Sequence, residues 1–139
     1  MPHSTLLKFI FTYDNSFGVP LVPITFFNKD GVPTQLLNNA ILDSGAHEIT
    51  IPKALADMLG LKLQPRSNPV HTAGGLIEAY TATINFNLGR GGRFVHYANV
   101  DICVIKQCPA VLIGIHPIFE DYTVTIMAHK RKCILEPRE

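Results

Sequence analysis

Apolar residues in this chain fall in short runs of strand length, separated by clusters of Gly, Pro, Asn, Asp and Ser. Such runs, bounded by turn-forming residues, are typical of β-strands. The predicted strands are Thr5–Thr12, Val19–Phe27, Val32–Leu37, Ala40–Leu42, Thr81–Leu88, Phe94–Val100, Val100–Ile105, Ala110–Ile113, Tyr122–Met127 and Cys133–Leu135. The pattern therefore predicts a mostly β protein.

Two short helices are expected between the strands. In residues 50–60, Pro52 suits the first helical position and Gly60 suits the stop. The residues expected on the buried face of this helix are Ala54, Leu55, Met58 and Leu59. A second helix is expected to open at Pro117 and to contain Ile118 and Phe119. Helices this short are expected to cover a β core rather than to form a bundle.

An acidic turn follows the apolar run Ala40–Leu42. Its residues, Asp43, Ser44, Gly45 and Ala46, place one carboxylate where a buried strand ends. An ionised carboxylate beside an apolar run is costly unless it is hydrogen-bonded, so Asp43 is either well satisfied or adapted for chemistry. An ordinary turn is the alternative, because Asp, Ser and Gly all favour turns.

Two further stretches matter for function. In residues 71–80, two extended arms surround Gly74 and Gly75, which predicts a hairpin with a mobile tip. Such a hairpin suits a lid over a substrate, although an ordinary surface hairpin has the same pattern. Further on, Ala110–Ile113 and Gly114 repeat the arrangement of an apolar strand that ends in glycine before a short helix.

Composition narrows the function classes. A length of 139 residues suits one domain, taken as 1–139, and 47% hydrophobic against 17% charged residues suggests that a partner subunit covers some apolar surface. A net charge of +1 argues against a nucleic-acid binder that depends on electrostatic attraction. RNA binding through Arg90 and Arg93 stays a weak alternative to a solvated turn. No apolar run is long enough to span a membrane.

The cysteines and histidines indicate neither a disulfide framework nor a metal site. Cys103, Cys108 and Cys133 are odd in number and form no Cys-x-x-Cys pair, and the six histidines lack metal-ligand spacing. Reduced structural thiols are expected, and no metal or cofactor. The amino terminus lacks the basic region of a signal peptide, so a cytoplasmic location is expected.

The ordered set of these motifs resembles the retropepsin-like aspartic proteases, the single-lobe relatives of pepsin, and a bacterial-type member is expected. The resemblance covers about residues 19–135 and leaves residues 1–18 without a role. It implies a closed antiparallel barrel with one or two short helices and one lobe per chain. Ser44 stands where many members carry Thr, and Ile115 and His116 stand where many bacterial relatives carry Arg or Asp.

The resemblance also implies roles for individual residues. Asp43 would be catalytic, and the residues that support its loop would be Ser44, Gly45, Ala46, Ile113 and Gly114. The flap that closes over an extended polypeptide substrate would contain Ala73, Gly74, Gly75 and Leu76. The Ser44 hydroxyl would hydrogen-bond across a dimer, and Gly45 would let the backbone approach the substrate.

Counting carboxylates leads to a homodimer. Hydrolysis by this chemistry needs two facing aspartates, and Asp57, Asp101 and Asp121 lack the strand and glycine context of Asp43. Two Asp43 residues related by a two-fold axis would share one proton and activate a water between them, with activity favoured at acidic to mildly acidic pH. The alternative is a non-catalytic module of the same fold that binds a peptide or only dimerises.

Overall fold

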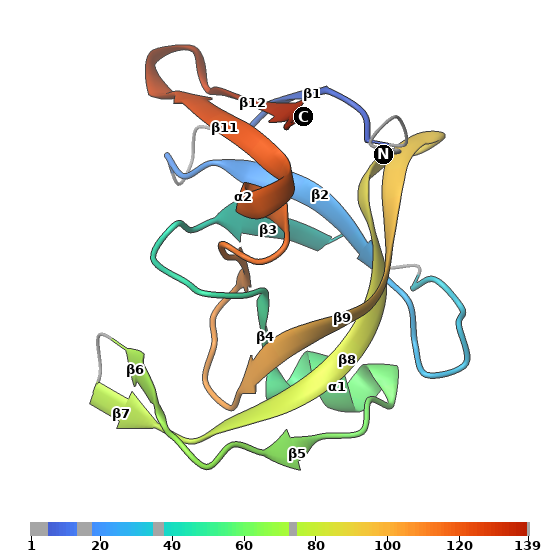
Figure 1. Cartoon of the computed structure of the whole chain (residues 1–139), viewed down its shortest axis with the longest axis vertical. Helices are drawn as coiled ribbons and strands as arrows, with labels where there is room; N and C mark the ends of the chain where they lie inside the picture. Colours follow the sequence, from blue (N-terminus) through green and yellow to red (C-terminus); the bar gives the residue numbers. More distant parts are fainter. Residues whose placement is uncertain (1–5, 14–17, 35–37, 73–74, 139) are drawn as a thin grey trace.

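A computed structural model describes residues 6–13, 18–34, 38–72 and 75–138 of the chain. Six strands close into a barrel, with each strand paired to the next and β2 paired back to β8 (Figure 1). In order around the barrel they are β2 (Leu21–Phe26), β3 (Asn38–Leu42), β10 (Val111–Ile113), β4 (Thr50–Pro52), β9 (Arg93–Ile105) and β8 (Ala79–Arg90). The short strand β5 (Gln64–Pro65) adds to the edge of β8. The expected closed, mostly antiparallel barrel is confirmed.

Two parallel pairings interrupt the antiparallel pattern. β10 runs parallel to β3, with Ile113 opposite Leu42, and β4 runs parallel to β9. Parallel neighbours need a crossover connection rather than a tight hairpin, so residues distant in sequence meet here. The pairing of β3 with β10 brings Asp43 beside Gly114, one residue beyond the end of each strand.

The long β8–β9 hairpin supplies much of the barrel wall. Its inward residues on β8 are Ala82, Ile84, Phe86 and Leu88, all buried. Two strands were expected over residues 94–105, but β9 is continuous. Asn99 adopts a left-handed φ of 54°, and its backbone N–H donates to Oδ1 of Asn85 at 2.7 Å. Asn tolerates this conformation, so the strand bends around a bulge instead of ending.

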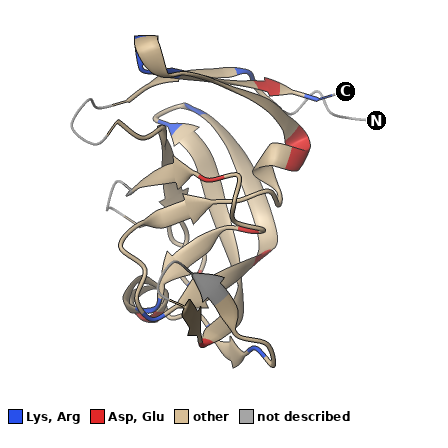
Figure 2. Ribbon diagram, turned by 90° about the vertical axis from the view of Figure 1, so that its left-hand side faces the viewer, with Lys and Arg blue, Asp and Glu red and all other residues tan. Residues whose placement is uncertain are grey.

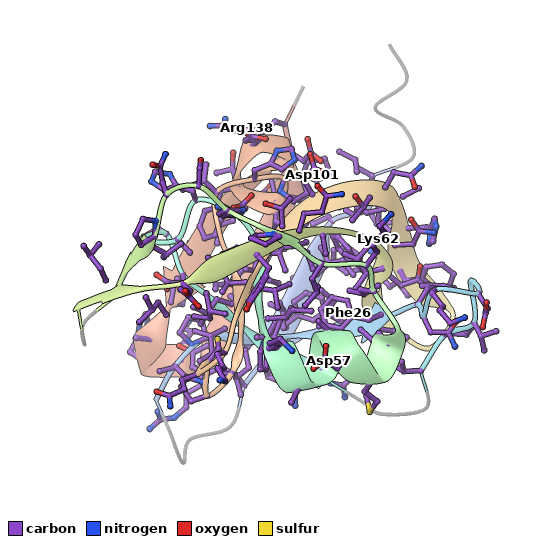
Figure 3. All side chains as sticks on the ribbon, turned by 90° about the horizontal axis from the view of Figure 1, so that it is seen from below. Phe26, Asp57, Lys62, Asp101 and Arg138 are labelled. Carbon is purple, nitrogen blue, oxygen red and sulfur yellow. The ribbon has the colours of Figure 1, made fainter. Side chains whose placement is uncertain are left out.

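Aromatic and branched aliphatic side chains fill the barrel. Phe26 and Phe86 are fully buried and meet edge to face, with ring centroids 6.3 Å apart. Figure 3 looks onto the end of the barrel where α1 (Lys53–Leu59) lies, with Phe26 labelled. Burying one such side chain stabilises the fold by about 1.5–3 kcal/mol relative to leaving it exposed.

The helix α1 corrects one expectation from the sequence. Its buried residues are Ala56 and Leu59, whereas Met58 is 56% exposed and Ala54 is also exposed. The predicted face is thus right at Leu59 and at the half-buried Leu55, which packs against the core, and wrong at Ala54 and Met58. Pro52 is the residue before the helix rather than its first residue, and Gly60 ends the helix with a φ of 73°.

A second sheet covers the other end of the molecule (Figure 1). Its strands are β1 (Phe9–Thr12), β12 (Lys132–Pro137) and β11 (Tyr122–Met127), with α2 (Ile118–Asp121) before β11 and a 3-10 turn, η2 (Ala128–Lys130), between β11 and β12. The ring of Phe9 stacks on that of Phe11, with ring centroids 5.1 Å apart, and packs against the ring of Tyr122, with centroids 6.3 Å apart. The amino-terminal segment, which had no assigned role, thus contributes β1 to this sheet. The start of the predicted strand, Thr5, lies outside the described residues.

Of the remaining predicted elements, the diglycine hairpin is present and the strand after Gly31 is not formed by the described residues. A hairpin of β6 (Val70–Thr72) and β7 (Gly75–Ile77) projects from the barrel where the diglycine predicted one (Figure 1). The strand expected over residues 32–37 is reduced to a single bridge between Phe27 and Pro33, and residues 35–37 lie outside the described part. Among the described helices, none combines the length and the apolar character needed to cross a membrane.

Candidate active site

Asp43 stands where β3 leaves the barrel wall. Ala40 and Leu42 point into the core and fix the direction of the strand. The backbone N–H of Asp43 donates to the carbonyl oxygen of Ile113 at 2.9 Å, which continues the β3–β10 pairing by one residue. The carboxylate is therefore attached to a rigid strand end rather than to a mobile loop.

The turn after Asp43 positions its side chain. Oδ1 accepts a hydrogen bond from the backbone N–H of Gly45 at 2.9 Å, and the carbonyl oxygen accepts one from Ala46 at 3.1 Å. Asx-type turns of this kind restrict the side chain because it closes a ring with its own backbone. Asp43 is half-buried, while Ser44 on the same turn is exposed. One carboxylate oxygen is thus held toward the turn.

Gly114 lets a second segment support this turn from beneath. A Cβ at this position would lie 2.5 Å from the carbonyl oxygen of Ala46 and 2.6 Å from that of Glu48, closer than any side chain allows. The next residues donate their backbone N–H groups to the same loop, Ile115 to Ala46 at 2.9 Å and His116 to His47 at 2.8 Å. The structure therefore brings together the six residues predicted as the catalytic aspartate and its support.

The predicted flap is described only in part. Thr72 pairs with Gly75 and His71 with Leu76 in the β6–β7 hairpin, and the Leu76 side chain is 60% exposed. Ala73 and Gly74 lie outside the described residues. At its base, Val70 and Ile77 pack against a small apolar cluster of Ala79, Cys103 and Ile105.

A pocket of about 870 Å³ connects the turn with the base of this hairpin, and we call it the Asp43 pocket. Its lining residues are Asp43, Gly45, Ala46, His47, Glu48, Thr50, Arg66, Ser67, Asn68, Pro69, Val70, Thr81, Cys103, Ile105 and Leu112. The volume lies within the usual range of ligand sites. Asp43 thus faces a space large enough for several side chains of a bound molecule.

Sequence reasoning missed the charged pair in the Asp43 pocket. Nη2 of Arg66 forms an ion pair with Oε1 of Glu48, and its Nε donates to Oγ1 of Thr81 at 3.0 Å. Both charged side chains are mostly buried, with exposed fractions of 27% for Arg66 and 21% for Glu48. Glu48 lies on the loop before β4, and Arg66 lies 18 positions later, directly after β5. No local sequence pattern therefore indicates that they form a pair.

Other groups near the site do not suggest a different chemistry. Burial raises the pKa of the Cys103 thiol, an effect that the positive charge of Arg66 partly offsets, so the thiol stays protonated at neutral pH. Within the described part of the chain, no three His, Cys, Asp or Glu side chains gather closely enough to hold a metal ion. The functional candidate in this pocket is the carboxylate of Asp43.

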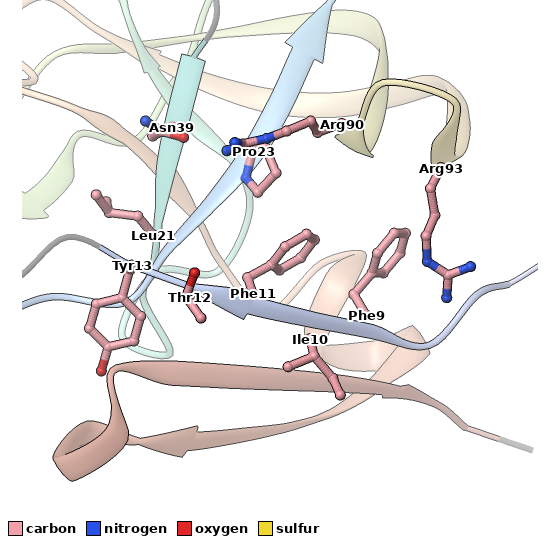
Figure 4. A pocket seen from close by; sticks show the side chains of 10 residues that line it. All are labelled: Phe9, Ile10, Phe11, Thr12, Tyr13, Leu21, Pro23, Asn39, Arg90 and Arg93. Atoms are coloured by element: carbon pink, nitrogen blue, oxygen red, sulfur yellow. The ribbon is translucent and has the colours of Figure 1, made fainter.

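A second pocket of about 450 Å³ lies away from Asp43, between β1 and the β8–β9 turn (Figure 4). Its wall is largely aromatic and aliphatic, and Arg90 and Arg93 extend over it (Figure 4). The Arg93 guanidinium lies 5.7 Å from the ring centre of Phe9 and donates to the carbonyl oxygen of Lys8. No Asp or Glu lines this second pocket.

The charge distribution gives no support to RNA binding. Figure 2 shows Lys and Arg in separate short stretches of the described chain, interspersed with Asp and Glu. Nucleic-acid binders usually carry a continuous basic face. With Arg93 engaged on Phe9, the weak RNA alternative loses one of its two residues.

Comparisons with known proteins agree with this geometry. The chain resembles the crystal structure of a retropepsin-like aspartic protease from Rickettsia conorii, with a TM-score of 0.63 and 21% identity over 93% of this chain and 89% of that one. It also resembles EIAV protease in complex with the inhibitor HBY-793, with a TM-score of 0.53 and 16% identity over 78% of this chain and 92% of that one. At these identities the likeness shows the fold.

A search among curated proteins found no match. The family model described as aspartyl protease matches residues 22–116, which include β3, the Asp43 turn, the β6–β7 hairpin and β10. The matched segment is most of the chain and contains the whole candidate site. The chain therefore belongs to the aspartyl protease family and has the retropepsin-like fold.

Proposed function

We propose that the protein is an aspartic endopeptidase that acts as a homodimer, with Asp43 of each chain as the catalytic carboxylate. The observation that carries the proposal is the position of Asp43, held by the Gly45 amide and the β10 segment at the wall of a large pocket. Membership of the aspartyl protease family supports the same reaction class.

A second chain is needed because one chain offers one suitable carboxylate. The Asp43 pocket contains two acidic residues, Asp43 and Glu48, and Glu48 is paired with Arg66. A two-fold axis that places two Asp43 side chains face to face supplies the missing carboxylate without any new residue. Ser44 is exposed on the same turn, and its hydroxyl would hydrogen-bond across that axis.

The chemistry follows from two carboxylates at close range. Both cannot be ionised cheaply, so the pair holds one proton between them. The ionised member takes a proton from a bridging water, which attacks the peptide carbonyl carbon. The protonated member donates a hydrogen bond to the developing oxyanion and then supplies a proton to the leaving nitrogen. Activity is accordingly highest at acidic to mildly acidic pH.

The substrate is an extended polypeptide. The β6–β7 hairpin projects beside the Asp43 pocket, where a peptide strand lying between them would form backbone hydrogen bonds and place its side chains alternately. The hairpin containing Ala73, Gly74, Gly75 and Leu76 would close over this strand as a flap and exclude water from the scissile bond.

Cleavage of an unfolded protein tests the proposal. Wild type, Asp43→Asn and Asp57→Asn would be compared at several protein concentrations between about pH 3 and 7. Asp57 is exposed on α1, so its variant controls for loss of a carboxylate elsewhere. We expect cleavage that peaks at acidic pH, disappears in Asp43→Asn alone and falls more than proportionally on dilution.

Two results would contradict the proposal. Equal cleavage by wild type and Asp43→Asn would remove Asp43 from catalysis. Absence of cleavage at a concentration where sedimentation shows a dimer would favour a module that binds peptides without cutting them.

A further inference from the structure

We propose that the Glu48–Arg66 pair makes the Asp43 pocket selective for a carboxamide side chain, that of Gln or Asn, at one substrate position. The inference rests on the proposed function, because it assumes that a peptide occupies this pocket. It assigns a role to two residues that the catalytic mechanism does not use.

Arg66 is held in place before any substrate arrives. Its backbone N–H donates to the carbonyl oxygen of Ala79 at 2.9 Å, and its side chain is bound to Thr81 on one side and to Glu48 on the other. These two side-chain contacts use two of the five N–H donors of a guanidinium. A fixed donor set of this kind selects by geometry, because little side-chain entropy is lost when a ligand binds.

The pair offers donors and an acceptor side by side. The ion pair occupies Oε1 of Glu48, and a carboxylate has a second oxygen that can accept hydrogen bonds. A carboxamide has the complementary set, with a carbonyl oxygen for Arg66 and an N–H₂ group for Glu48. The apolar side chains of Val70, Ile105 and Leu112 line the same pocket and suit the methylene groups of Gln.

Other side chains fit less well for electrostatic reasons. When a peptide covers the pocket it displaces water from a pair that is already mostly buried, and an aliphatic side chain returns no hydrogen bonds to either charge. A charged side chain is attracted by one member of the pair and repelled by the other. A neutral side chain that both donates and accepts avoids these costs.

The test uses peptides that are identical except at one position. A parent peptide that wild type cleaves would be varied at each position near the scissile bond to Gln, Leu, Glu or Lys, and kcat/KM would be measured. We expect one position at which the peptide with Gln has a kcat/KM about tenfold higher than the peptides with Leu, Glu or Lys.

Substitutions in the pair should change the preference in opposite directions. Glu48→Gln leaves the Arg66 charge uncompensated, so the Glu peptide should become the best substrate. Arg66→Gln leaves the Glu48 charge, so the Lys peptide should become the best. The double variant Glu48→Leu with Arg66→Leu should prefer the Leu peptide.

A matched control comes from α1. Lys53 forms an ion pair with Asp57 at 3.0 Å, outside the Asp43 pocket. Lys53→Gln removes one charge of a pair just as Arg66→Gln does, and it should leave the ranking of the peptides unchanged. Thermal unfolding of each variant shows whether it is folded.

The outcomes separate this inference from the proposed function. If wild type cleaves all four peptides equally, or if the pair variants lower every rate without changing the ranking, the pair is only structural and the inference fails while the protease assignment stands. If wild type cleaves no protein or peptide, the function fails, and fluorescence anisotropy of wild type with labelled peptides of one host sequence, in which each position in turn is Gln, Leu, Glu or Lys, decides the selectivity. Preferred binding of the Gln peptide there supports the inference, and equal or absent binding overturns it.

Discussion

The Cα of Gly114 lies so close to the loop after Asp43 that a Cβ on it would come within 2.5 Å of the carbonyl oxygen of Ala46. The neighbouring atoms are backbone atoms of that loop, which cannot rotate away as a side chain could. The close contact arises because the segment after β10 supports the Asp43 turn from beneath. Any side chain at position 114 must therefore displace the backbone at Ala46 and Glu48, in the loop that follows Asp43.

Gly114→Ala should lose both stability and activity. Overpacking of this kind costs about 1–3 kcal/mol of unfolding free energy, and the displaced loop should lower kcat more than stability alone explains. Urea unfolding and cleavage rates measured on the folded fraction would check both effects.

Gly92 offers the matched control. A Cβ there meets nothing within 4 Å, and its φ is not in the left-handed region. Gly92→Ala should change the unfolding free energy by no more than about 0.5 kcal/mol. Equal losses in the two variants would show that space at position 114 is not the cause.

Sequence patterns predicted most of the longer strands because those strands have a local signal, whereas β4 (Thr50–Pro52) lies where the start of a helix was expected. The runs that became β2, β8, β9, β10 and β11 are apolar or alternating and are bounded by turn formers. The orientation of α1 had no such signal. In a helix of only two turns, more than one face contains apolar residues, so the pattern does not show which face is buried. Tertiary packing chose the arc with Ala56 and Leu59 and left Met58 exposed.

The residues of the candidate site also differ in how far the sequence could predict them. Asp43 and Gly45 are neighbours in sequence, whereas a supporting role for Gly114 was implied only by the family resemblance. In the structure the parallel register of β3 and β10 brings the two strand ends together. The contact between Glu48 and Arg66 depends on how a loop runs back along β8, which no short motif records. Local chemistry was therefore predictable, whereas the charged pair required the fold.

The observed orientation of α1 predicts unequal effects from neighbouring residues. Leu59→Ala removes a side chain that is 1% exposed and should cost about 2–5 kcal/mol of unfolding free energy. Met58→Ala, at 56% exposure, should change it by no more than about 0.5 kcal/mol. Urea unfolding of both variants checks this, and a larger loss for Met58→Ala would mean that Met58 is buried, as the sequence pattern predicted.

Tyr97 links barrel strand β9 to α2, the short helix that precedes β11, through one hydrogen bond. Its hydroxyl donates to Oδ2 of Asp121 at 2.7 Å, and burial together with this bond raises the pKa of the phenol well above its usual range. Tyr97→Phe keeps the ring, which stacks on Phe86 at 5.0 Å, and removes only the hydroxyl. We expect a loss of about 1–3 kcal/mol in unfolding free energy, because Asp121 loses its donor.

A double variant isolates that bond. Once Asp121→Ala has removed the acceptor, adding Tyr97→Phe should cost less than it does in wild type. Full additivity of the two losses would mean that the hydroxyl stabilises the fold in some other way.

Cys133 should make the protein less stable at alkaline pH. Its thiol is fully buried, and burial raises its pKa to about 11 from an ordinary value of 9.0. In the unfolded chain the thiol ionises at lower pH than in the folded one, so its contribution is complete below about pH 9 and is lost as the pH rises toward 11. The loss is at most about 2–3 kcal/mol.

Urea unfolding of wild type and Cys133→Ala at pH values from about 7 to 11 would measure this effect. At neutral pH the variant should be less stable, by about 1 kcal/mol, because the sulfur leaves a small cavity. Its stability should then decline less steeply than that of wild type between about pH 9 and 11. Some decline should remain, because burial also raises the pKa of Tyr122, to about 12, and that of the Cys103 thiol. Parallel curves for the two proteins would show that Cys133 does not titrate differently on folding.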